Sequence, residues 1–412
     1  MSRSRHDRIL LLATARDVSN AQQLEGELKR RHFAVDLSTY GAGYARGDRW
    51  DPHSTHVVAL IPRPHTSTDG FQPAEATAHL FSEYPNHRVT IVAHVDDGLP
   101  QASFEQAYQV VWDSGRLSQL LSEVIRAITG PWPFWLEARF AAEDVIEPTG
   151  VAWWSNDLLI ADTHRDHLIQ LSDAGGVSLV LPGLSEPHHV TVDRRQIFVA
   201  NVGENNIITA QIVHGQAAAL REIDVGPLDP GLDRPHSATR IGNLMAIADT
   251  DNNRVVMGRE QQPSSWLTLD GAAPGQPFRF PCGLHFSVNQ LWVTNRDVGL
   301  IDLFELSPRP RHLMRFGDDC LVDPNALIRW RDFLIVADEQ RRSLPVFRIQ
   351  EHKGMIHAVD SIGELAVPVL GSPFGLSINR GERLAVADRD LGCVWTIALE
   401  HVPLLADVAA WP

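Results

Sequence analysis

Two imidazoles and one thiol occupy the same position of a repeated segment, directly after its first proline. They belong to His188, His236 and Cys282. Imidazole nitrogen and thiolate sulfur are donors that zinc and copper prefer in proteins. The pattern therefore predicts a zinc or copper site at these three residues, to which the nearby His189 and His285 could contribute. The alternative interpretation is that the imidazoles fill a tapered channel and bond to backbone carbonyls.

The segment that carries these residues occurs six times. Each copy begins with a proline, runs through a short apolar strand and a turn, and ends a second strand on Asp or Asn. The prolines are Pro148, Pro187, Pro235, Pro281, Pro324 and Pro373, and the final residues are Asp162, Asn201, Asp249, Asn295, Asp338 and Asp388. The spacing from proline to Asp or Asn is 14 residues in five copies and 15 in the last, while the repeat period varies from 39 to 49 residues. This regularity predicts a six-bladed β-propeller with four strands per blade over residues 146–412.

In such a propeller, the residue after each proline should lie at the mouth of the central channel. The predicted ring is Thr149, His188, His236, Cys282, Asn325 and Phe374. The Asp or Asn that ends each second strand can cap the following turn by accepting bonds from backbone N–H groups. Calcium binding is the alternative use of these oxygen ligands.

The sequence of the repeat resembles a known family. Pro148–Ile169 and Met245–Val256 resemble the NHL repeat, and the likeness extends over about two thirds of the chain. It implies a propeller but no single activity, because NHL propellers include protein binders, RNA binders, lyases and lactonase-like enzymes. The Pro-His pairs also resemble those of peptidyl-hydroxyglycine lyase, whose zinc-binding histidines follow such prolines on alternate blades. Here the candidate ligands lie on neighbouring blades.

Residues 1–130 alternate apolar strands with helical segments, which is typical of an α/β fold with a parallel, flavodoxin-like sheet. The expected strands are Ile9–Thr14, Ala34–Ser38, His56–Pro62, Val89–Val95 and Gln109–Asp113, and the expected helices are Ser19–His32 and Leu117–Ile128. Residues 131–145 are expected to form a linker. Either Phe134–Ala141 or Val402–Val408 could supply the outer strand of the last blade.

Three segments of this first region resemble TIR domains. Leu10–Asp17 is similar to the family's opening strand, Val57–Pro62 to its third strand, and Ser67–Glu75 to an element with an aromatic residue four positions before a glutamate. In TIR enzymes that glutamate contacts the nicotinamide ribose of NAD. The resemblance therefore implies NAD as a substrate, with Glu75 as the catalytic residue and Phe71 as its neighbour. The family's tryptophan and cysteine are missing, and a docking module is the alternative.

Charge and cysteine content restrict the partners. The net charge is −15, and residues 1–133 hold roughly 13 basic and 15 acidic side chains, so most of the negative charge belongs to the propeller. This charge argues against nucleic acid and anionic membranes as partners. The three cysteines form no CxxC pair, and no apolar run reaches the ~18 residues of a membrane span. A cytoplasmic protein is expected.

The leading functional prediction is recognition. The propeller would bind a protein or a small ligand on its channel face, while the TIR-like domain docks or signals, with oligomers as an option. Two alternatives are a TIR-type NAD-cleaving effector with a propeller sensor, and a metal-dependent lyase or hydrolase at His188, His236 and Cys282.

Overall fold

The computed structural model describes two compact units, residues 1–133 and 134–412. In the first unit, the described residues are 8–14, 18–31, 33–40, 56–61, 88–94, 108–112, 117–129 and 132–133. In the second they are 134–406, except 142–143, 214, 261, 270, 274–275, 308, 353, 366 and 368–369. No helix within these ranges is long and apolar enough to cross a membrane.

The first unit contains a five-stranded parallel sheet with the strand order β2-β1-β3-β4-β5. Its strands are β1 (Arg8–Thr14), β2 (Ala34–Tyr40), β3 (His56–Ile61), β4 (Arg88–His94) and β5 (Tyr108–Trp112). Helix α1 (Val18–Arg30) contacts β1 and β2, and helix α3 (Leu117–Thr129) contacts β4 and β5. Each helix buries an apolar stripe, which includes Leu24 and Leu28 on α1. The order is a general doubly wound one and is not specific to the TIR family.

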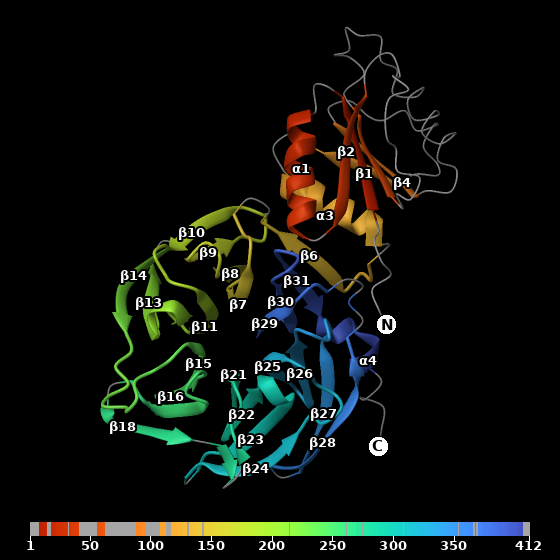
Figure 1. Ribbon diagram of the computed structural model, residues 1–412. Coiled ribbons are helices and arrows are strands. Elements are labelled where there is room, and N and C mark those ends of the chain that lie inside the picture. The colour runs from red at the N-terminus through yellow and green to blue at the C-terminus, as the bar shows by residue number, and fades with distance from the viewer. Residues whose placement is uncertain are drawn as a thin grey trace. The chain divides into compact units, whose positions relative to one another are not determined.

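The second unit is a six-bladed β-propeller, with its blades arranged around a central channel (Figure 1). Blade one consists of β7 (Pro148–Trp154), β8 (Asp157–Asp162), β9 (His167–Leu171) and β10 (Val177–Leu181). Blade two consists of β11 (Pro187–Asp193), β12 (Gln196–Asn201), β13 (Asn206–Val213) and β14 (Gln216–Glu222). Blade three consists of β15 (Pro235–Ile241), β16 (Leu244–Asp249), β17 (Arg254–Arg259) and β18 (Gln262–Leu269).

The remaining blades repeat this plan. Blade four consists of β21 (Pro281–Ser287), β22 (Gln290–Asn295), β23 (Leu300–Glu305) and β24 (Arg311–Phe316). Blade five consists of β25 (Pro324–Trp330), β26 (Phe333–Asp338), β27 (Pro345–His352) and β28 (Met355–Glu364). Blade six has β29 (Pro373–Ile378), β30 (Arg383–Asp388) and β31 (Cys393–Ala398) from the C-terminal end of the chain. A short hairpin of β19 (Gly271–Ala273) and β20 (Gln276–Pro277) precedes blade four, and the short helix α4 (Pro403–Ala406) follows blade six. Within the described residues, 3-10 turns occur at Val202–Glu204, Arg296–Val298 and Leu399–His401.

The outer strand of blade six comes from the residues that precede blade one. Strand β6 (Leu136–Phe140) pairs antiparallel with β31 and lies beside it in Figure 1. Of the two alternatives for ring closure, Phe134–Ala141 is therefore correct, whereas Val402–Val408 is wrong because its described part continues into α4. This arrangement covers the edge that β31 would otherwise expose, which is a general way for a propeller to avoid an open sheet edge.

Every inner strand contains a β-bulge next to its proline. In blade one, Pro148 pairs with Asp162 but the next pair is Gly150 with Ala161, so one residue of the inner strand is extra. The other five blades show the same shift after their prolines. A bulge leaves the extra residue outside the ladder and redirects its side chain. The constant spacing from proline to Asp or Asn in the sequence therefore reflects the register of a hairpin that contains one bulge.

The Asp or Asn that ends each second strand holds the segment before its own proline. Asp162 accepts hydrogen bonds from the backbone N–H groups of Ile146 (2.7 Å) and Glu147 (3.1 Å). The corresponding residues of the other five blades accept equivalent bonds. Asp162, Asp338 and Asp388 also bond to amides of the turn that follows them, which confirms the capping prediction for these three. Asn201 and Asn295 form no such bond to the described turns that follow them. These side-chain oxygens already accept hydrogen bonds from backbone N–H groups, so the presence of Asp or Asn at this position is explained without calcium binding.

Candidate functional site

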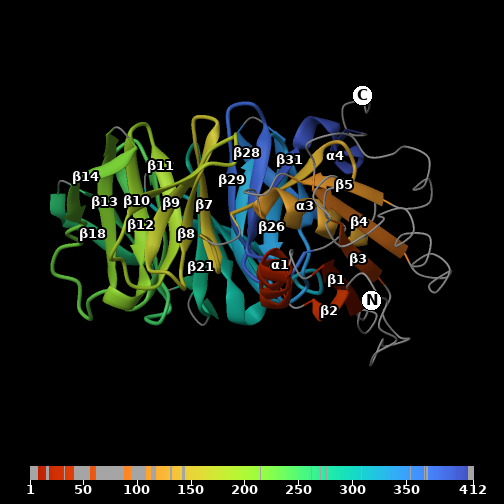
Figure 2. The same ribbon diagram turned by 90° about the horizontal axis from the view of Figure 1, so that it is seen from above.

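The six inner strands contact their neighbours in ring order and enclose the channel. Each strand begins with its proline at one end of the channel, here named the proline end. Each turns into its second strand at the other end, named the hairpin end. Figure 2 shows the propeller from the side, with the strands running between these two ends.

The residues after the prolines contact one another across blades. The rings of His188 and His236 meet edge to face with centroids 4.5 Å apart, and His188 also meets Phe374 at 5.6 Å. The Nδ1 atom of His236 lies 3.5 Å from Sγ of Cys282. Thr149 is buried and donates a hydrogen bond to the carbonyl of Pro187, which begins the next blade (3.1 Å).

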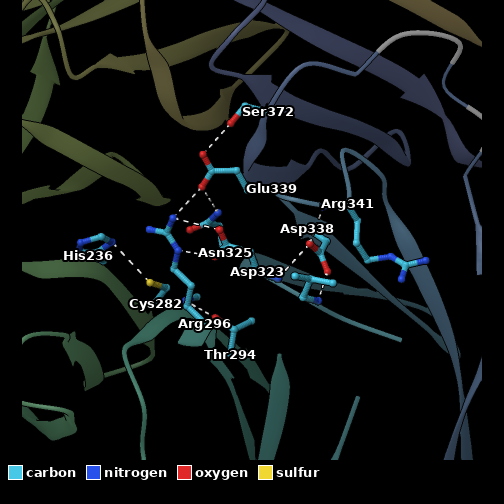
Figure 3. Close-up of polar contacts among 12 residues, drawn as sticks. His236, Cys282, Thr294, Arg296, Asp323, Asn325, Asp338, Glu339, Arg341 and Ser372 are labelled. Atoms are coloured by element: carbon cyan, nitrogen blue, oxygen red, sulfur yellow. Dashed lines mark hydrogen bonds and ion pairs between the residues drawn. The ribbon is translucent and has the colours of Figure 1, made fainter. Parts of the chain in front are cut away.

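Next to these residues lies a buried carboxylate that the sequence interpretation missed. Glu339 follows Asp338 directly, is 9% exposed, and accepts bonds from four side chains. Its Oε1 accepts bonds from Ser372 Oγ (2.9 Å) and from Nη2 of Arg389, and its Oε2 accepts bonds from Nη2 of Arg296 (3.0 Å) and Nδ2 of Asn325 (2.9 Å). Figure 3 shows Glu339 between Ser372 and Arg296, with His236 and Cys282 on the other side of Arg296.

Two arginines at this end are held by carboxylates but keep part of their surface exposed. Arg296 also pairs with Asp323, and its side chain remains 25% exposed. The side chain of Arg389 remains 33% exposed. A guanidinium has five N–H donors, so pairing with Glu339 fixes each group in place without using all of its hydrogen-bonding capacity. The aromatic rings of Phe280 and Phe374 lie beneath Arg296 and Arg389, at 5.6 and 5.7 Å.

The protonation states at the proline end favour binding over proton transfer. Burial, followed by the charges of Arg234, Arg389 and Arg296, lowers the pKa of His188 from 6.5 to about 3. Burial, followed by the charge of His188, holds the pKa of His236 well below its usual value. Burial likewise raises the pKa of the Cys282 thiol. A general base works best with a pKa near the ambient pH, and a cysteine nucleophile reacts as thiolate. At neutral pH these histidines are neutral and weakly basic, and the thiol is protonated.

The predicted metal ligands form a pair but not a set of three. The separation of His236 Nδ1 and Cys282 Sγ would suit two ligands of one ion, but His188 meets His236 through a ring contact. Across the part of the chain that the structure describes, no three His, Cys, Asp or Glu side chains are grouped so that they could hold a metal ion. His285 and His189 lie farther along the channel, where they line the cavity at the hairpin end.

Two residues of the ring that follows the prolines each have a buried polar atom with no hydrogen-bond partner among the described residues. These atoms are Oδ1 of Asn325, whose residue is 4% exposed, and Nδ1 of His188. A buried polar atom without a partner costs free energy, on the order of 1–3 kcal/mol. An acceptor on Asn325 and a neutral imidazole beside two fixed guanidinium groups therefore form a set of bonding groups that a polar ligand would complete.

The sequence did contain a signal for the missed residues. The position after each Asp or Asn forms a second ring, which is Thr163, Val202, Thr250, Arg296, Glu339 and Arg389. Three consecutive blades place charged residues there, in the order positive, negative, positive. The repeat alignment alone would have placed these charges side by side.

Comparison with known proteins shows only distant similarity to solved structures and assigns no activity. Among solved structures, the chain is similar to a streptogramin B lyase (12% identity, TM-score 0.45, 64% of this chain and 99% of that chain). It is also similar to a gluconolactonase from Xanthomonas campestris (16%, 0.47, 64% and 88%) and to the soluble aldose sugar dehydrogenase of Escherichia coli (11%, 0.47, 64% and 99%). Identities and TM-scores this low carry no argument about function. No family model and no curated protein matches the sequence.

The NHL and TIR resemblances consequently rest on the quoted residues alone. The class that the structure defines is a six-bladed β-propeller preceded by a unit with a parallel sheet. The two residues on which the prediction of NAD cleavage depends, Phe71 and Glu75, lie outside the described residues.

Proposed function

We propose that the propeller is a recognition module that binds a small polar ligand at the proline end of its channel. The observation that carries this proposal is the Glu339 network, in which two partly exposed guanidinium groups are fixed beside the unpartnered Oδ1 of Asn325. Groups fixed before binding lose little conformational entropy on binding, so their hydrogen bonds contribute more to affinity.

The chemistry of the end defines the ligand class. Arg296 and Arg389 offer N–H donors that suit a carboxylate, and Asn325 offers an acceptor that suits a hydroxyl or amine donor. Phe280 and Phe374 provide apolar surface beside these groups. A small organic acid that also carries a hydroxyl or amino group fits all three features, either free or as the exposed end of a larger partner.

A ligand screen with paired variants tests this proposal. We expect at least one hydroxy acid or amino acid, in a panel followed by thermal shift and calorimetry, to bind the full-length protein. Arg389→Met should weaken that binding by about tenfold, which corresponds to about 1.4 kcal/mol. The matched control is Arg221→Met on outer strand β14, where the side chain is 61% exposed. The proposal fails if no member of the panel binds, or if both variants bind equally well.

The two catalytic alternatives remain separate predictions with their own tests. A metal-dependent lyase or hydrolase requires an ion at His236 and Cys282 with further ligands. Stoichiometric zinc or copper in protein purified without chelator, lost in His236→Ala, would favour it over recognition. An NAD-cleaving effector requires release of nicotinamide from NAD by the full-length protein, and loss of that activity in Glu75→Gln.

A further inference from the structure

The hairpin end of the channel opens into a cavity of about 840 Å³ that is separate from the Glu339 network. All six inner strands contribute to its walls, and none of the residues that directly follow the prolines does. A volume of this size is typical of sites that enclose small organic ligands. The cavity therefore has room for a ligand of its own.

The inner part of this cavity is mostly apolar. Val190, Leu284, Leu327 and Leu376, which are all buried, occupy the same position on four inner strands, three residues after the proline. His189, one residue closer to its proline, also lines the cavity, and its Nδ1 is buried without a hydrogen-bond partner among the described residues. Burial lowers the pKa of His189 to about 4, so this side chain is neutral at physiological pH.

The next level of the cavity wall is polar on four of the six strands and carries no charge. Thr191, Thr239 and Ser377 occupy the position four residues after the proline on their strands, and His285 occupies it on blade four. Burial, followed by the charge of Arg329, lowers the pKa of His285 to about 4. These groups can orient a ligand through hydrogen bonds without adding charge.

The rim is strongly basic in an otherwise acidic protein. The charged residues that line the cavity are four arginines and one aspartate, namely Arg194, Arg195, Arg240, Arg380 and Asp193. Arg240 is occupied by bonds to Gly242 and Gln196. By contrast, the exposed Arg194, Arg195 and Arg380 form no side-chain hydrogen bond or ion pair within the described ranges. Because the chain carries a net charge of −15, three unpaired arginines around one opening form a local exception that would attract anions.

We infer that the hairpin end is a second binding site, for an organic anion with an apolar body. The apolar part would lie against the leucine and valine level. The carboxylate, sulfonate or phosphate would remain at the rim, near Arg194, Arg195 and Arg380. This site is independent of the ligand proposed for the proline end, because the two share no side chain.

Two fluorescent probes with one aromatic skeleton test the inference. The anionic probe is 8-anilinonaphthalene-1-sulfonate, and the neutral probe is N-phenyl-1-naphthylamine, which lacks the sulfonate. We expect the folded full-length protein to bind one anionic probe per chain, about tenfold more tightly than the neutral probe. The double variant Arg194→Ser with Arg195→Ser should weaken the anionic probe by about tenfold and leave the neutral probe unchanged.

A control of equal charge separates a local effect from a general one. Arg221→Ser with Arg311→Ser removes two exposed arginines from the outer strands β14 and β24, and it should change neither affinity. Thr239→Trp should fill the cavity and displace both probes, and the arginine variants keep the test valid if this one does not fold. Arg389→Met at the proline end should leave probe binding intact.

The outcomes are decisive in both directions. Equal affinity for the two probes, equal weakening in the control double variant, or no saturable binding of the anionic probe would each overturn the inference. Loss of the anionic probe in the Arg194 and Arg195 double variant alone supports it. Since Arg389→Met affects only the proline end, failure of one site is distinguishable from failure of the other.

Discussion

The two ends of the propeller channel use arginine in opposite ways. At the proline end, Arg296 and Arg389 are partly buried and are paired with Glu339. At the hairpin end, Arg194 and Arg380 are exposed and unpaired among the described residues. A paired arginine has a fixed position and little net field, whereas an unpaired one contributes charge without a fixed geometry. The proline end is therefore built for selective hydrogen bonding, and the hairpin end for attraction of charge.

The largest expected difference between the ends is in stability. Glu339→Gln replaces a carboxylate that holds two guanidinium groups, so Arg389 loses its carboxylate partner in a partly buried place and Arg296 keeps only Asp323. We expect the free energy of unfolding to fall by about 3 kcal/mol, as measured by urea denaturation. Arg380→Gln at the hairpin end should change it by less than about 0.5 kcal/mol. Equal effects of the two variants would contradict the contrast between paired and unpaired charge.

The separation of the two ends depends on close packing between the inner strands. A methyl group added at Gly150 would lie 2.4 Å from the backbone oxygen of His188 and 3.0 Å from Cα of His189. We expect Gly150→Ala to lower the free energy of unfolding by about 2 kcal/mol, because the backbone of blade two has to move. Gly231→Ala is the matched control, since its added Cβ meets no atom within 4 Å. A neutral Gly150→Ala would show that the channel is not tightly packed at this level.

The sequence predicted the positions of the blades better than the side-chain contacts at the two ends of the channel. The spacing between Pro148 and Asp162 is set by a bulged hairpin, which is local in the chain, and blade one lies where the sequence placed it. The closing strand β6 has no repeat signature, because an outer strand does not contribute to the inner ring, so two alternatives remained open. The partners of Glu339 come from blades four, five and six, and such contacts appear only when neighbouring blades pack together.

The lining of the hairpin-end cavity could not be predicted from the sequence either. Leu284 and Leu376 are ordinary strand residues in the sequence, and nothing in their local pattern distinguishes a channel wall from a blade core. Arg194, Arg195 and Arg380 occupy hairpin turns, where polar residues are expected in any propeller. Their convergence around one opening depends on the closure of six blades, which the period predicts in number but not in geometry.

Acid should destabilise both ends through their neutral histidines. The pKa of His285 is about 4 in the folded protein and near 6.5 when the residue is exposed, so below pH 6.5 the unfolded chain binds a proton that the folded chain does not. Stability is therefore retained above pH 6.5 and is lost as the pH falls toward 4. For one such histidine the loss is about 1 kcal/mol at pH 5.5.

His285→Gln should remove this contribution and flatten the pH dependence of the urea midpoint between pH 7 and 5.5. The control is His164→Gln, because His164 is exposed on a turn of blade one. Equal slopes in the two variants would mean that His285 titrates in the folded state as freely as in the unfolded chain. The same comparison with His188→Gln should show an equal contribution from the proline end in this pH range, because a folded-state pKa of about 3 leaves His188 as fully neutral at pH 5.5 as His285.

The smallest effect on stability, and the most direct test of access, comes from thiol labelling. Cys282 at the proline end is 2% exposed and its thiol pKa is raised by burial, so a maleimide should reach it only when the structure opens. A cysteine introduced by Thr239→Cys would lie in the wall of the hairpin-end cavity. We expect this position to react at least about a hundredfold faster than Cys282, with a stability change below about 0.5 kcal/mol.

Peptide mass spectrometry separates the two sites, and Cys393, which is 1% exposed within blade six, reports global unfolding in the same sample. If Cys282 reacts as fast as the introduced thiol, the proline end is open to reagents and the difference between the two ends disappears. If Cys282 and Cys393 react together, and only as the protein unfolds, the Cys282 thiol is as protected as a thiol inside a blade, although Arg296 and Arg389 at the same end remain partly exposed.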